Sequence, residues 1–139
     1  FAILMGSSRA FYGKFGDKIN LERFMQYSAV LCMVSYLMIA FIPVPALGIL
    51  GCAVCGLSVG IMWPGTFSMA AASVKRGGTA LFALLALAGD VGCSSGPTYV
   101  GMISGALNDN LKLGIFAALI FPVLMILGIK MIGSLRKYD

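Results

Sequence analysis

The chain has 139 residues, of which 60% are hydrophobic and 11% are charged. An ordinary soluble domain is about 25% charged, so this chain lacks the polar surface that a soluble domain needs. Intrinsic disorder is excluded as well, because it requires low hydrophobicity and high net charge. An integral membrane protein remains, and the net charge of +5 then indicates basic cytoplasmic loops and not nucleic-acid binding.

Four apolar runs are long enough to cross the ~30 Å hydrocarbon core of a bilayer. They predict helices over 24–42, 46–74, 79–107 and 113–132. Before them, residues 1–14 resemble the end of a further helix and residues 15–23 form a polar loop, while residues 133–139 form a basic tail. The sequence therefore predicts an all-α polytopic bundle with four full spans and an N-terminal helix stub.

The basic residues indicate the orientation of this bundle. Nine of the ten fall on one predicted side: Arg9, Lys14, Lys18, Arg23, Lys75, Arg76, Lys130, Arg136 and Lys137. Lys112 alone falls on the other side. Cytoplasmic loops carry an excess of Lys and Arg, so the C-terminus is predicted to be cytoplasmic.

The four cysteines all lie within apolar spans. Cys52 and Cys55 form a CxxC pair, but the chain has no second pair and no histidine. We therefore interpret the cysteines as packing residues and expect no metal site, no cofactor and no enzymatic activity.

The most specific local pattern is R-x-x-x-G-x-x-x-D-K in the first polar segment, followed by one further basic residue. Its members are Arg9, Gly13, Asp17, Lys18 and Arg23. A glycine permits close approach of another helix near the membrane surface, and an acid can cap a helix N-terminus or pair with Arg. The alternative interpretation is a solvated loop that its positive charge holds in the cytoplasm.

This loop resembles the G-x-x-x-D-R/K-x-G-R-R signature of the major facilitator superfamily, in the copy that joins helices 8 and 9. Asn20 stands at the usual second glycine, and Leu21-Glu22-Arg23 replaces the double-basic pair. The resemblance implies that residues 1–14 end helix 8, that the four spans are helices 9 to 12, and that an N-terminal half is missing. It also implies that Asp17 contacts that other half and that helices 9 and 12 are peripheral.

Asp90 is the single charge within the third run and lies about 16 Å into it, close to the bilayer midplane. An ionised aspartate at this depth costs at least ~2.5–3.5 kcal/mol, so it must face water, pair with another group or stay protonated. A proton-coupled site can use this choice. The alternative is a protonated Asp90 that is hydrogen-bonded within the bundle. No basic residue of the chain is expected at its depth.

Helical periodicity gives the third span two faces. A small-residue face suited to close packing contains Gly89, Gly92 and Gly96. A polar face about 135° away contains Asp90, Ser94, Pro97 and Gly101. This run also looks like the glycine-rich helix 11 of the superfamily, in which a Gly-Pro pair provides a bend.

The second span contains Trp63-Pro64-Gly65, which predicts a break near its middle. The resemblance places this span beside the central cavity, so that Trp63 and Asp90 share one cavity, with Thr66, Thr98 and Tyr99 as further polar liners. Trp63 as a packing residue is the alternative.

The sequence and the resemblance together predict part of a secondary active transporter in the plasma membrane. It would move a small polar solute, such as a sugar or an organic metabolite, and its symport ion would be a proton. The alternative function is a small non-transport four-helix membrane protein with a structural or partner-binding role.

Overall fold

The computed structural model describes residues 1–74 and 76–135, without the side chains of Asp17 and Leu135. Its elements are α1 (Ala2–Phe15), the 3-10 helix η1 (Gly16–Lys18), α2 (Leu21–Phe41), α3 (Pro45–Val59), α4 (Met62–Ser73), α5 (Gly78–Ala106), α6 (Leu111–Ala117) and α7 (Ile120–Leu135). Four helical segments are long and apolar enough to cross a membrane: Leu21–Phe41, Pro45–Ser73, Gly78–Ala106 and Leu111–Ser134. The predicted all-α, four-span organisation of a multi-pass membrane protein is thereby confirmed.

The predicted loop over 15–23 is shorter in the structure. Asn20 is the N-cap of α2, and its side-chain oxygen accepts a hydrogen bond from the Arg23 backbone N–H at 3.4 Å. This cap satisfies one of the free N–H groups that every helix start carries. The first span therefore begins at Leu21, and Arg23 lies in its first turn.

Two of the four spans are interrupted, each just before a proline. Pro64 is the third residue of α4 and Pro122 is the third residue of α7. A proline ring clashes with the carbonyl group four residues earlier, which belongs to Gly60 and Ala118 respectively. The predicted break in the second span is therefore present, but it lies at Gly60–Ile61, ahead of the Trp63-Pro64-Gly65 sequence.

The centre of the described chain is α2, which packs against α3, α4, α6 and α7. Its buried residues are Met25, Ser28, Ala29, Cys32, Ser35 and Ala40. Met25 also forms an apolar cluster with Met69 of α4 and Ile129 of α7. The peripheral place that the resemblance implies for this span refers to the cavity of a whole transporter, so it stays a prediction.

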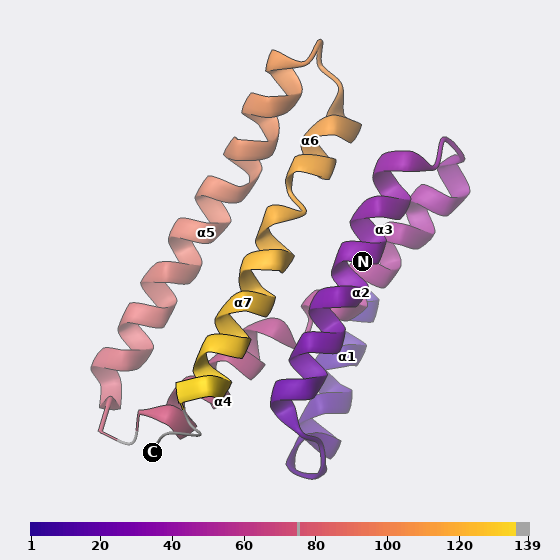
Figure 1. Cartoon of the computed structure of the whole chain (residues 1–139). Coiled ribbons are helices and arrows are strands. Elements are labelled where there is room, and N and C mark those ends of the chain that lie inside the picture. Colours follow the sequence, from indigo (N-terminus) through magenta and orange to yellow (C-terminus); the bar gives the residue numbers. More distant parts are fainter. Residues whose placement is uncertain (75, 136–139) are drawn as a thin grey trace.

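In contrast to the central α2, α5 packs mainly against α6 and to a smaller extent against α4. Figure 1 shows it at one side of the bundle, beside α6 and α7. Ser104 is its one buried residue. Most of the surface of this 29-residue helix is therefore uncovered in the chain.

The connections between helices lie at two ends of the bundle (Figure 1). The turn after α1, the connection from α4 to α5 and the end of α7 lie at one end, and the α2–α3 and α5–α6 connections lie at the other. Lys112 is the second residue of α6 and so belongs to the second end. Lys75, Arg136 and Lys137, which contribute to the predicted charge asymmetry, lie outside the described residues.

Candidate functional site

Two glycines of α3 bring α1 against the interrupted span. A Cβ atom on Gly56 would lie 2.6 Å from the Phe1 carbonyl oxygen, and one on Gly60 would lie 2.7 Å from the Met5 carbonyl oxygen. These separations are too short for any side chain. The pair Gly56 and Gly60, four residues apart, therefore sets the close packing of α1 on α3.

This close packing brings Arg9 to the helix break. Its Nε donates a hydrogen bond to the Gly60 carbonyl oxygen at 3.1 Å. Because Pro64 has no N–H, it cannot make the ordinary helical bond to that carbonyl. The Arg9 guanidinium takes the place of the missing donor.

The break before Pro122, between α6 and α7, shows that a side-chain donor to the freed carbonyl is particular to Gly60. There, the Ala118 carbonyl accepts a hydrogen bond from the Phe121 backbone N–H at 3.1 Å, so the local chain satisfies it. At Gly60 the donor is a charged side chain from another helix.

This geometry places Arg9 within the helix that was predicted for residues 1–14. Its partner, Gly60, is the sixteenth residue of the 29-residue candidate span Pro45–Ser73. The chain thus places a basic side chain beside the middle of a candidate span, whereas none was expected near the depth of Asp90. The sequence spacing missed this because it could not show where α1 packs.

Arg9 lines a cavity of about 340 Å³ that is formed by α1, α2, α4, α7 and the end of α3. Its polar and aromatic lining consists of Arg9, Cys32, Tyr36, Trp63, Thr66 and Phe121. The Thr66 hydroxyl donates a hydrogen bond to the Met62 carbonyl at 2.7 Å. Its oxygen can therefore still accept a hydrogen bond from another group. A volume of this size fits a small solute.

Trp63 joins this cavity to α5. A Cβ atom on Gly89 would overlap the six-membered ring of Trp63, so this glycine permits the contact between the two helices. Phe67 continues the contact, because its ring lies 4.7 Å from the Trp63 ring and stacks on Phe82 of α5 at 5.7 Å. Trp63 therefore both packs and lines the cavity, which combines its two predicted roles.

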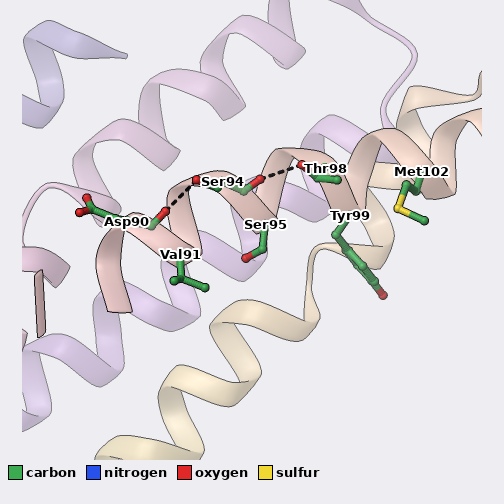
Figure 2. Close-up of a pocket in the computed structure, with 7 residues that line it drawn as sticks. All are labelled: Asp90, Val91, Ser94, Ser95, Thr98, Tyr99 and Met102. Carbon is green, nitrogen blue, oxygen red and sulfur yellow. Dashed lines mark hydrogen bonds between the residues drawn. The ribbon is translucent and has the colours of Figure 1, made fainter. Parts of the chain in front are cut away.

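Asp90 lines a second hollow, which runs along α5 (Figure 2). Its lining comes from this helix alone: Asp90, Val91, Ser94, Ser95, Thr98, Tyr99 and Met102. The Ser94 hydroxyl donates to the Asp90 carbonyl at 2.9 Å, and the Thr98 hydroxyl donates to the Ser94 carbonyl at 2.8 Å. The structure thus brings four predicted site residues, Asp90, Ser94, Thr98 and Tyr99, to the lining of one hollow.

The predicted single cavity for Trp63 and Asp90 is divided in the structure. Trp63 and Thr66 line the Arg9 cavity, Asp90 lines the hollow on α5, and the two linings share no residue. They adjoin at Phe121, which lines the Arg9 cavity and meets Tyr99 edge to face at 5.8 Å. The division arises because Trp63 contacts α5 through Gly89, while the Asp90 face lies elsewhere on that helix.

The small-residue face of α5 is occupied only at Gly89. A Cβ atom on Gly92 or Gly96 would meet no described atom within 4 Å, and the same holds for Gly101 on the polar face. Pro97 lies inside the helix, which continues through it from Gly78 to Ala106. The face predicted for close packing is therefore largely open in this chain.

The loop motif is only partly described. A Cβ atom on Gly13 would have no described neighbour within 4 Å, so the predicted close approach at this glycine is not made within the chain. Lys18 ends η1 and is exposed. Asp17 lies in the same short helix, and its side chain falls outside the described residues.

The sequence reasoning missed two cavity residues on the helices it assigned to the periphery. Tyr36 on α2 and Phe121 on α7 both line the Arg9 cavity. Phe121 precedes Pro122, so the second proline was the available signal that this segment is irregular. Nothing in the sequence singled out Tyr36.

The chain was compared with protein-family models, curated proteins and solved structures, and none of these matches it. The assignment of function therefore depends on the two sites alone.

Proposed function

We propose that this chain is part of a secondary active transporter of the major facilitator type, which moves a small polar solute across the membrane by alternating access. The carrying observation is the helix break at Gly60–Ile61, where Arg9 bonds to the freed carbonyl beside a cavity of about 340 Å³. Discontinuous helices that border a polar cavity are typical of solute sites in transporters. Charged residues within membrane spans also mark solute and ion pathways.

In this proposal, Asp90 is the proton-handling residue and the Arg9 cavity holds the solute. The two sites adjoin through the Tyr99–Phe121 contact, so a change at one can reach the other through packed side chains. The uncovered face of α5, which carries Asp90, would be covered by the N-terminal half of the transporter. The lipid bilayer surrounds both halves.

The proposal also sets location and orientation. The transporter lies in the plasma membrane with its C-terminus in the cytoplasm. The end of the bundle with the turn after α1 and the α4–α5 connection then faces the cytoplasm, in line with Lys18 and Arg76 at this end.

The test is solute counterflow into proteoliposomes that contain the transporter carrying this chain. Vesicles preloaded with unlabelled solute should transiently accumulate the labelled solute, and vesicles without protein should not. A panel of sugars, organic acids and amino acids identifies the solute. If the transporter moves no member of the panel, the structural or partner-binding alternative is favoured.

A further inference from the structure

The charge of Arg9 has no described counter-charge in its cavity. The described lining contains no acidic side chain. A guanidinium carries five N–H donors, and the Nε bond to Gly60 uses one of them. A cation within a membrane span costs at least ~2.5 kcal/mol unless water or an anion faces it. The cavity therefore offers charge and donors to a negatively charged group.

The Nε bond also fixes the guanidinium in the cavity. The bond to a backbone carbonyl holds one edge of the planar group, and the bond forms at a helix break that close α1–α3 packing stabilises. An Arg fork held in this way matches the two oxygens of a carboxylate or a phosphate. A lysine or a loop arginine would not present donors with such fixed geometry.

The remaining lining suits the body of a small organic anion. Trp63 and Tyr36 supply two aromatic side chains, and Tyr36 also carries a hydroxyl donor. Thr66 contributes an acceptor oxygen for a hydroxyl of the solute. The volume of about 340 Å³ admits a molecule of metabolite size together with its anionic group.

We propose that the Arg9 cavity binds an anionic solute through its carboxylate or phosphate group, which the Arg9 guanidinium receives between Trp63 and Tyr36. The inference rests on the proposed transport function, for which it names the substrate class. Its source is a soluble anion and not a lipid headgroup, because the helix break lies near the middle of its span and headgroups lie at the membrane surface.

Trp63 provides the readout, because it is the one tryptophan of the chain and lines the cavity. The full chain in a zwitterionic detergent is titrated with butyrate, inorganic phosphate and the neutral isostere butyramide at constant ionic strength. We expect a saturable change in Trp63 fluorescence with butyrate or phosphate, and at least tenfold weaker binding of butyramide. Equal binding of acid and amide, no response to either anion, or a response to phosphatidylglycerol alone would overturn the proposal.

Two variants distinguish anion binding in the Arg9 cavity from a general effect of positive charge on the chain. Arg9→Gln should weaken anion binding at least tenfold, whereas Lys14→Gln, which removes the same charge from a position on α1 outside the cavity lining, should leave it unchanged. Equal loss in both variants contradicts the inference. Circular dichroism checks the fold, and if Arg9→Gln does not fold, the butyrate–butyramide comparison on the unaltered chain decides.

The binding assay requires no transport. Anion binding in a protein that fails the counterflow test would contradict the proposed transport function but support the anion site. Counterflow of a solute without an anionic group, together with no anion binding, would overturn this inference and leave the transport function.

Discussion

The hydrogen bond at the helix break depends on three residues together: Arg9, Gly60 and Pro64. Pro64 removes the helical donor for the Gly60 carbonyl, the missing side chain of Gly60 admits α1, and α1 delivers Arg9 to the freed oxygen. An unpaired carbonyl in a span would cost free energy, since lipid offers no donor. The Arg9 guanidinium is thus engaged at a helix break near the middle of a candidate span.

A double-mutant cycle tests this dependence. Arg9→Gln should lower the free energy of unfolding by about 1–3 kcal/mol, because the Gly60 carbonyl loses its donor. In a Pro64→Ala background the same change should cost less, because the introduced alanine supplies the backbone N–H that proline lacks, and we expect a coupling energy of ~0.5–3 kcal/mol. The measurement is SDS-induced unfolding followed by helix content. Pro97→Ala in α5 is the control, and equal coupling with both prolines would exclude a specific role for Pro64.

Asp90 gives the second prediction for a single residue. Its carboxylate lies on the uncovered face of α5, beside hydroxyls that already bond to the helix backbone. In the full transporter, Asp90→Asn should abolish solute accumulation driven by a pH gradient while solute exchange continues, because the amide cannot carry the proton. Flux in proteoliposomes with and without a gradient measures both. Unchanged accumulation would remove Asp90 from the coupling mechanism, and Asp109→Asn in the turn between α5 and α6 is the control for charge.

At the scale of helices, glycine spacing decides which pairs approach closely. The second span contains glycines of two kinds, since Gly56 and Gly60 lie against α1 while a Cβ atom on Gly48 would meet nothing within 4 Å. The sequence shows all of them as equivalent small residues. The structure therefore separates packing positions from open ones, which periodicity alone could not do.

This difference predicts that replacement of glycine by alanine has opposite effects on stability at two positions of the second span. Gly60→Ala should lower the free energy of unfolding by about 1–3 kcal/mol, because the new methyl group would lie 2.7 Å from the Met5 carbonyl oxygen. Gly48→Ala should be neutral or stabilising by up to ~1 kcal/mol, because alanine favours a helix where space is available. Unfolding in SDS measures both variants. Equal effects would show that α1 does not pack on Gly60.

For the whole chain, the sequence predicted what depends on apolar length and on local rules. The four spans, the break in the second span and the polar face of α5 all follow from runs of residues and from proline chemistry. The packing of α1, the central place of α2 and the division of the site into two hollows depend on which helices meet. Helices in a bilayer meet through small residues and polar contacts, and this pattern allows several arrangements.

The orientation of the whole molecule gives the last prediction. Single cysteines at Lys18 and Arg76 lie toward one end of the bundle and a cysteine at Lys112 lies toward the other, so a membrane-impermeant maleimide should separate them. In intact cells that express a version with Cys32, Cys52, Cys55 and Cys93 replaced by serine, Lys112→Cys should react and the other two should not. After the cells are permeabilised, all three should react, which controls for accessibility. Because the basic end is attracted to the cytoplasmic side, the reverse pattern would mean that loop charge does not set the orientation of this chain.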